Sequence, residues 1–412
     1  MEGFPILAYV AIGLGFIGIA VGRLPRLAMN RTTIALAAAI AVVELGGISH
    51  GEAFAAVDVE TLALLLAMMI LVANLRISGF FSLAGAKFLS RTKSPRAFLA
   101  LVVVFSGFLS ALFMNDTICI MLTPFVLEIA KRSGRNGLPY LVGLAISANA
   151  GSCATAIGNP QNMLIAAQSG IPFFSFFLNL AIPSMFAMFL CYWFCLLAFR
   201  QEFSAPFLSK TRPETPGEAG PVDRRLLAKS LAASGILLVA LALGMRTSLA
   251  ALLSAALLLF TRRIHPDRIL SQVDFSLLIF FSALFVLTAG VARSPLFLAM
   301  MDRVVPMLDK PGVGFSAAIL AVSNLVSNVP AVMLLSPVAR SFQESQAAWL
   351  VLAMASTFAG NLTLLGSVAN LIVAEQGEKC GVRMGFLDYL KVGLPVTILS
   401  IAFGTFWLGL VA

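Results

Sequence analysis

The chain has 412 residues, of which 59% are hydrophobic and 11% charged, and its formal net charge is +9. Soluble domains are about 45–50% apolar and about 25% charged, so this composition excludes a water-soluble globule and predicts a polytopic membrane protein. The apolar runs are continuous, which excludes an alternating transmembrane β-barrel. Since a helical span needs about 20 residues, about ten spans fit and a separate catalytic domain does not.

In chain order, the apolar runs that predict membrane spans are 4–22, 31–49, 60–78, 140–170, 172–199, 226–244, 247–263, 273–292, 346–374 and 384–411. Two further apolar segments, 96–132 and 311–343, are interrupted by Asn115-Asp116-Thr117 and by Ser327-Asn328-Val329-Pro330. Each is too long for one span and short for two, which predicts a re-entrant helical hairpin.

Three more segments complete the predicted organisation. Segments 80–93 and 294–309 lie directly before the hairpins and predict interfacial helices, and the polar residues 201–224 predict a linker. With the N-terminus outside, 23 of the 28 Lys and Arg residues fall in cytoplasmic segments and 5 fall outside. This asymmetry predicts a cytoplasmic linker and two outside termini in a bacterial inner membrane. It also explains the positive net charge without a nucleic acid partner.

The two halves of the chain repeat each other. Asn115 and Pro124 match Asn328 and Pro337 at an offset of 213, and Asn162 matches Asn370 at an offset of 208. We therefore predict an N-terminal repeat over 1–200, with hairpin 96–132 and broken helix 140–170, and a C-terminal repeat over 225–412, with hairpin 311–343 and broken helix 346–374. Five spans per repeat is an odd number, so the second repeat is inverted. Inverted repeats with broken helices are typical of secondary transporters, which bind substrate near the bilayer midplane.

The polar interruptions carry residues that start helices. Asn159 before Pro160 predicts an N-cap, and we expect Asn328, Asp116-Thr117 and Ser367 to cap their half-helices in the same way. The half-helix N-termini would then offer backbone N–H groups and positive dipole ends to one cavity. Small polar residues in membrane helices often serve packing alone. Here their symmetric placement at the interruptions favours a substrate cavity.

Asp116 is the one acidic residue deep inside an apolar run. An intramembrane carboxylate costs about 2.5–3.5 kcal/mol even on insertion scales, and such residues are functional by default. The alternative is a purely structural role, in which Asp116 only caps the second helical arm of the hairpin. Its repeat equivalent is Val329, so only the first of the two repeats carries this charge. We predict that Asp116 is the proton-coupling residue.

The sequence contains no motif that predicts a catalytic site or a metal site. It has no metal-spaced His/Cys cluster, no GxSxG and no phosphate loop, so we predict neither an enzyme nor a metal or cofactor. Cys119 and Cys153 lie near the interruptions, and direct thiol contact with a substrate is the less favoured alternative because buried Cys commonly acts as a small hydrophobe.

The motifs around the interruptions resemble the ArsB/NhaD-type branch of the ion transporter superfamily. They are Phe113-Met-Asn-Asp-Thr, Leu122-Thr-Pro, Ser147-Ala-Asn-Ala-Gly, Ala156-Ile-Gly-Asn-Pro-Gln-Asn, Ser323-Asn-Leu-Val-Ser-Asn and Gly360-Asn-Leu-Thr-Leu-Leu-Gly-Ser-Val-Ala-Asn. The resemblance implies alternating access around a central substrate site. Carried over by motif, that site comprises Asn115, Asp116, Thr117, Asn149, Thr155, Asn159, Asn162, Asn328, Thr357, Asn361 and Thr363.

Within this branch, the residues favour export of arsenite or antimonite as a neutral hydroxide, coupled to protons. The carboxylate of Asp116 would repel a dianion, and no Lys or Arg in the interruptions offsets it, which disfavours inorganic and carboxylate anions. Sodium/proton antiport is the runner-up, because the same carboxylate suits it. The predicted partners are the lipid bilayer, the substrate and protons. A homodimer is left open, since family members are often dimeric. A cytoplasmic ATPase partner is left open.

Overall fold

The computed structural model describes residues 4–21, 28–89, 94–204, 222–260, 265–304 and 310–411. Regular secondary structure in these ranges is helical, without a strand. Six of the helices are long and apolar enough to cross a membrane, and shorter apolar helices accompany them. The prediction of an all-α polytopic membrane protein is confirmed, while most of the predicted linker 201–224 lies outside the described residues.

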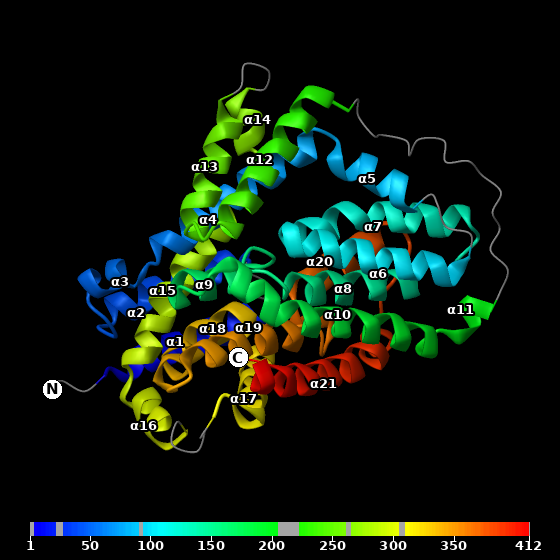
Figure 1. Ribbon diagram of the computed structural model, residues 1–412. Coiled ribbons are helices and arrows are strands. Elements are labelled where there is room, and N and C mark those ends of the chain that lie inside the picture. The colour runs from blue at the N-terminus through cyan, green and yellow to red at the C-terminus, as the bar shows by residue number, and fades with distance from the viewer. Residues whose placement is uncertain are drawn as a thin grey trace.

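Six helices form a first group, in which helices of one repeat pack against helices of the other (Figure 1). They are α1 (Ile6–Val21), α2 (Arg31–Glu44), α4 (Val59–Ile77), α12 (Arg224–Ala242), α13 (Thr247–Leu259) and α15 (Phe275–Arg293). Helix α2 packs against α1 and α15, and α13 packs against α12 and α4. The third span of each repeat therefore packs on the second span of the other. The two third spans also begin with equivalent caps. The side chain of Asp58 accepts from the backbone N–H of Thr61 at the start of α4, and the side chain of Asp274 accepts from that of Leu277 at the start of α15.

The second group holds the hairpins, the broken helices and the last spans. The hairpins are α6 (Pro95–Leu112) with α7 (Asn115–Arg132) and α17 (Val313–Val326) with α18 (Asn328–Ser341). The broken helices are α8 (Leu138–Ser152) with α9 (Pro160–Ser169) and α19 (Ser345–Ala359) with α20 (Val368–Lys379), the latter pair joined through the 3-10 turn η2 (Leu364–Gly366). The last spans α10 (Phe173–Ala198) and α21 (Phe386–Val411) pack against each other. Both predicted hairpins and both predicted breaks are confirmed.

Short helices occupy the connections. Helices α5 (Phe80–Leu89) and α16 (Pro295–Val304) directly precede the hairpins, where interfacial helices were predicted. Hydropathy did not predict α3 (His50–Ala56), α11 (Arg200–Ser204) or α14 (Pro266–Leu270), because they are short and partly polar. Helix α3 instead starts with a reciprocal capping box between Ser49 and Glu52. The predicted span 31–49 is correspondingly shorter, since α2 ends at Glu44.

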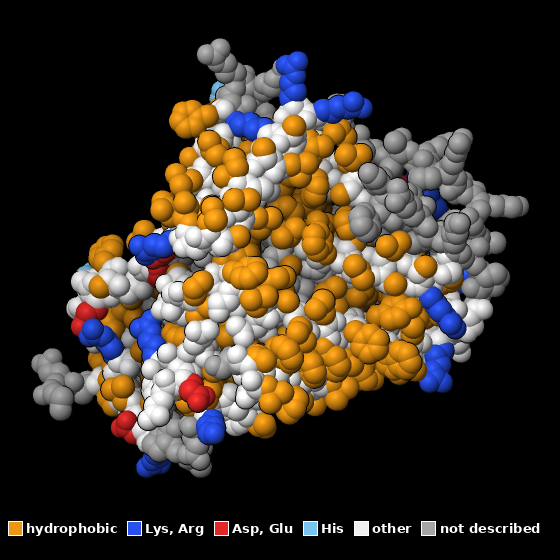
Figure 2. Space-filling view, viewed as in Figure 1, with side chains coloured by type: hydrophobic (Ala, Val, Ile, Leu, Met, Phe, Trp, Pro, Cys, Tyr) orange, Lys and Arg blue, Asp and Glu red, His pale blue; other side chains and the backbone are white. Residues whose placement is uncertain are grey.

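Ion pairs between helix ends agree with the predicted topology. Glu60 pairs with Arg246 at 2.9 Å, and Glu52 pairs with Arg293. Both pairs join segments predicted to lie on the outer side. Which side of the membrane faces the cytoplasm stays a prediction from the charge asymmetry. Figure 2 shows hydrophobic side chains over much of the viewed face and Lys and Arg toward its margins, as expected for a membrane-embedded surface.

Candidate functional site

Asn149, near the C-terminal end of α8, connects both broken helices with the first hairpin. Its Nδ2 donates to the carbonyl oxygen of Thr357 at 2.7 Å and to Oδ1 of Asn361 at 3.1 Å. Its Oδ1 accepts from Nδ2 of Asn115 at 3.5 Å. These side chains are buried. One amide thus joins residues more than 200 positions apart, at the point where the two repeats meet.

Thr357, in α19, is a second centre of contacts. Its Oγ1 accepts from Nδ2 of Asn159 and from Nε2 of Gln161, both at 3.3 Å, and lies 3.5 Å from Oδ1 of Asn162. The three partners belong to the start of α9, which Asn159 caps by accepting from the backbone N–H of Asn162. The predicted cap at Asn159-Pro160 is confirmed.

Equivalent asparagines bind the backbone of the two breaks. Nδ2 of Asn162 donates to the carbonyl oxygens of Ser152 at 3.2 Å and Thr155 at 2.9 Å. Nδ2 of Asn370 donates to those of Gly360 at 2.8 Å and Thr363 at 3.2 Å. Residues and bonds correspond at the offset of 208 that the sequence predicted. Backbone that leaves the helical pattern at membrane depth needs such internal partners.

Close backbone approach at the breaks requires glycine. A Cβ added at Gly151 would lie 2.2 Å from the carbonyl oxygen of Gly107, and one at Gly158 would lie 2.3 Å from that of Ser152. A Cβ at Gly360 would lie 2.7 Å from Nδ2 of Asn328. The first and third of these contacts bring the hairpins directly against the breaks, and the second lies within the first break.

The hairpin tips meet the breaks at the starts of their second arms. The backbone N–H of Asn115 donates to the carbonyl oxygen of Gly158 at 3.1 Å. Asn328 and Ser367 both lie beside Gly360. The starts of α7, α9, α18 and α20 therefore gather around the same network, as predicted.

Two of the four predicted caps, at Asp116-Thr117 and at Asn328, are wrong, and the third occupies its predicted position without a side-chain bond. The N-cap position of α7 is Met114, and Asp116 lies in the first turn. Asn328 is the first helical residue of α18, after Ser327, which has a φ of 80° and makes no cap bond. Ser367 occupies the cap position of α20 without a cap bond. The capping rule assumes a free helix start, whereas the starts of α7 and α18 pack against the breaks, where the backbone N–H of Asn115 donates to the carbonyl oxygen of Gly158 and Asn328 lies beside Gly360.

The predicted site residues divide into two sets by burial. The buried set is Asn115, Asn149, Thr155, Asn159, Asn162, Asn328, Thr357 and Asn361. Asp116, Thr117 and Thr363 are partly exposed. Within the described part of the chain, no hydrogen bond or ion pair reaches the carboxylate of Asp116. The sequence missed two members of the network, Gln161 and Ser152, whose Oγ accepts from Asn159 at 2.8 Å. The position of Gln161 in the capped first turn of α9 is the sequence feature that could have predicted its membership.

In the part of the chain that the structure describes, cysteines and acidic groups form no metal site. Among the described residues there is no group of three or more His, Cys, Asp or Glu side chains suited to a metal. Cys119 and Cys153 are fully buried, and within the described network Cys153 takes part through its backbone carbonyl, 3.3 Å from Nδ2 of Asn162.

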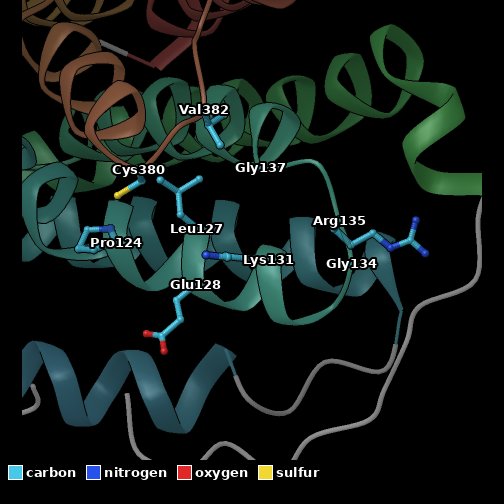
Figure 3. Close-up of a pocket in the computed structure, with 9 residues that line it drawn as sticks. All are labelled: Pro124, Leu127, Glu128, Lys131, Gly134, Arg135, Gly137, Cys380 and Val382. Atoms are coloured by element: carbon cyan, nitrogen blue, oxygen red, sulfur yellow. The ribbon is translucent and has the colours of Figure 1, made fainter. Parts of the chain in front are cut away.

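A separate pocket of about 560 Å³ lies at the other end of α7, between that helix and the loop that follows α20 (Figure 3). Its lining includes Glu128, Lys131 and Cys380. Arg135 points away from the other labelled side chains in this view, and it lies 3.8 Å from Glu202. The pocket lacks the asparagine and threonine residues of the predicted site, so we do not include it in that site.

Residues 16–359 match the family model described as citrate transporter. The chain belongs to the citrate transporter family. The silicon efflux transporter LSI3 of Oryza sativa subsp. japonica is 33% identical, covering 97% of this chain and 96% of the relative. The putative transporter arsB of Dictyostelium discoideum is 28% identical, covering 92% and 87%. The predicted superfamily is thereby confirmed at the level of the citrate transporter family, and the chain is a membrane transporter.

A solved structure of this fold is also similar. The crystal structure of the Alcanivorax borkumensis YdaH transporter matches with a TM-score of 0.55 and 16% sequence identity, covering 98% of this chain and 95% of that one. At this identity the match supports the fold alone.

Proposed function

We propose that the chain is a secondary active exporter of small neutral metalloid hydroxides, foremost arsenite and antimonite in their neutral forms, and that protons drive the export. One observation carries this proposal. The buried side chains that gather at the breaks are amides and hydroxyls, without a Lys or Arg among them.

Uncharged amides and hydroxyls suit a neutral solute that carries several hydroxyl groups, because they offer both donors and acceptors. Burying an ionised tricarboxylate beside them would leave its charge unpaired at a high desolvation cost. The names of two relatives, a silicon efflux transporter and a putative transporter arsB, agree with a neutral hydroxide. The family description names citrate, and the lack of basic side chains in this network argues against citrate as the substrate here.

Proton coupling is assigned to Asp116. It is adjacent to Asn115, which contacts the central network, yet it is partly exposed and caps no helix. A carboxylate in this position can exchange a proton with water on one side and respond to movement of the hairpin tip. Its uptake and release of a proton would link export to the proton gradient.

Uptake into inverted membrane vesicles tests the proposal. We expect arsenite to accumulate when a pH gradient is imposed and to equilibrate when the gradient is collapsed, and vesicles without the protein give the background. Citrate and sodium are measured in the same vesicles. Accumulation of sodium without arsenite would replace the proposal by sodium/proton antiport, and accumulation of citrate alone would replace it by anion transport.

A further inference from the structure

Another pocket lies where the start of α6, the end of α10 and the short helix α11 pack on one another (Figure 1). Its volume is about 350 Å³, within the range of about 300–1,000 Å³ that is typical of ligand sites. None of the residues that line it belongs to the predicted substrate site. The charge asymmetry predicts that this end of α10 faces the cytoplasm, so the pocket is expected at the inner surface of the membrane.

Two exposed arginines, Arg96 and Arg200, line this pocket. Within the described part of the chain, neither guanidinium group forms an ion pair or a hydrogen bond. The lining contains no Asp or Glu, and its one hydroxyl, on Ser204, donates to the backbone carbonyl oxygen of Arg200 at 2.9 Å. The pocket therefore presents two positive charges without a counter-charge. The planar fork of donors on arginine matches the geometry of a phosphate group.

The acidic residue next to the pocket is already occupied. The carboxylate of Glu202 lies 3.8 Å from Nη1 of Arg135 and accepts from the backbone N–H of Asn136 and the hydroxyl of Tyr140, both at 3.4 Å. Phe203 packs edge-on against Tyr140, with ring centroids 5.9 Å apart. These contacts fix α11 against the start of α8 and commit Glu202 there. Glu202 consequently does not neutralise the two arginines of the pocket.

The rest of the lining is apolar and continues along α10. Leu196, Leu197 and Phe203 line the pocket together with Trp193, which stacks on Phe189 with ring centroids 6.3 Å apart. Phe189, Trp193 and Leu197 recur every four residues, and their side chains are 56%, 50% and 38% exposed. They form an exposed apolar row that leads from the pocket along the helix. Tryptophan is enriched where a membrane meets water.

We propose that this pocket binds an acidic phospholipid, with Arg96 and Arg200 contacting the phosphate headgroup and an acyl chain lying along the row of Phe189, Trp193 and Leu197. Basic pockets between membrane helices are suited to such headgroups. A free phosphate ion would use the arginines and leave the apolar row without a role. A zwitterionic phospholipid would use the row and bring its own positive charge to the arginines. An acidic phospholipid complements both features.

Quenching of tryptophan fluorescence by brominated lipid tests the proposal, because Trp193 lines the pocket. Purified protein is placed in phosphatidylcholine vesicles that contain phosphatidylglycerol, with bromine on the acyl chains of one lipid or of the other. We expect brominated phosphatidylglycerol to quench more strongly than brominated phosphatidylcholine at the same mole fraction. Trp193→Phe should lose this difference, which identifies the reporter among the three tryptophans.

Arg96→Gln and Arg200→Gln should each lower the preference for phosphatidylglycerol about fivefold, since one basic residue near an acidic surface contributes about that factor. The double variant should show no preference. Arg224→Gln is the matched control, because Arg224 is also exposed, lies on the same predicted side and does not line the pocket. It should keep the wild-type preference. Arg96→Lys and Arg200→Lys keep the charge and should retain part of the preference.

Four results would overturn the proposal. Equal quenching of wild-type protein by the two lipids would exclude an acidic lipid beside Trp193. A preference that survives in the double variant, or that falls equally in Arg224→Gln, would show attraction to the general positive charge of this face. A preference that potassium phosphate removes, and that potassium chloride of equal ionic strength does not, would show that the pocket takes a free anion. Melting temperatures of the variants in pure phosphatidylcholine confirm that they are folded.

Discussion

Asp116 lies beside Asn115 in the first turn of α7, and Val329 occupies the equivalent place in α18. The two hairpins share the asparagine that contacts the breaks and differ in the neighbouring residue. The unshared carboxylate gives the first hairpin a titratable group that the second lacks. In the proposed function, the amides therefore bind the substrate and the acid couples transport to protons.

Asp116→Asn should uncouple transport. The amide keeps the size of the side chain and cannot titrate, so exchange of arsenite down its gradient should continue at close to the wild-type rate, while accumulation against a gradient should vanish. Uptake into inverted vesicles with and without an imposed pH gradient measures both. Asp116→Glu, which can still titrate, should retain part of the accumulation. Wild-type accumulation by Asp116→Asn would refute the coupling role.

The breaks should depend on amides rather than thiols. In Asn162→Ala, the carbonyl oxygens of Ser152, Cys153 and Thr155 lose their shared donor. An unsatisfied buried group costs about 1–3 kcal/mol, so the melting temperature in detergent and the transport rate should both fall. Replacing Cys119 and Cys153 together by Ala should leave transport close to wild type, because their thiols make no contact in the described network. Loss of transport in a correctly folded double variant would instead indicate direct sulfur contact.

At the scale of elements, the packing of α6 on α8 determines where the first break can lie. Ser106 and Ser147 face each other with their hydroxyl oxygens 2.6 Å apart, and Gly107 and Gly151 bring the two backbones into contact. The hairpin arm thereby fixes the last turn of α8, and the chain beyond it turns at Gly158 toward the tip at Asn115. Small residues at such crossings are typical of membrane helix packing.

Gly151→Ala should destabilise the protein strongly. The added Cβ would lie 2.2 Å from backbone atoms of Gly107, so α6 and α8 would have to separate, and overpacking of this kind costs about 1–3 kcal/mol or more. Gly235→Ala in α12 is the control, because nothing lies within 4 Å of its added Cβ. That variant should melt at or slightly above the wild-type temperature, since Ala is favoured in helices by about 1 kcal/mol. Equal melting temperatures for the two variants would contradict the close approach.

For the whole molecule, the two helix groups divide the fold into a frame and a body that holds the predicted site. The exchanged packing of α2 with α15 and of α13 with α4 ties the two repeats together in the first group. In the second group, the first hairpin and both broken helices share one buried network through Asn149 and Thr357, and Nδ2 of Asn324 in the second hairpin donates to the carbonyl oxygen of Ala359 at 3.2 Å. The repeat boundaries at 200 and 225 and the orientation in the membrane remain predictions from the sequence.

Cys380 provides a test of orientation in the native protein. It is exposed, the other four cysteines are buried, and it lies in a loop predicted to be cytoplasmic. An impermeant maleimide should label wild type in inverted vesicles and leave it unlabelled in intact cells. Met245→Cys in a Cys380→Ser background should show the opposite pattern, since Met245 is 40% exposed in a loop predicted to lie outside. Labelling of native Cys380 in intact cells would reverse the topology.

The sequence by itself determined the spans, the hairpins, the breaks and the repeat. These features are local, because continuous apolar runs require helices in a bilayer and polar interruptions mark where those helices stop. It also predicted candidate site residues by type and position, from Asn115 in the first hairpin to Thr363 in the second break.

Only the tertiary structure decided which groups those residues contact. Asn149 and Thr357 are 208 positions apart, and their bond exists because glycines let the elements approach closely. The same packing places Asn115 against Gly158 and Asn328 against Gly360, and neither Asp116 nor Asn328 caps its helix. It also left Oδ1 of Asn115 without a partner, because the orientation of an amide depends on every neighbour that shares its hydrogen bonds, and local sequence does not specify those neighbours.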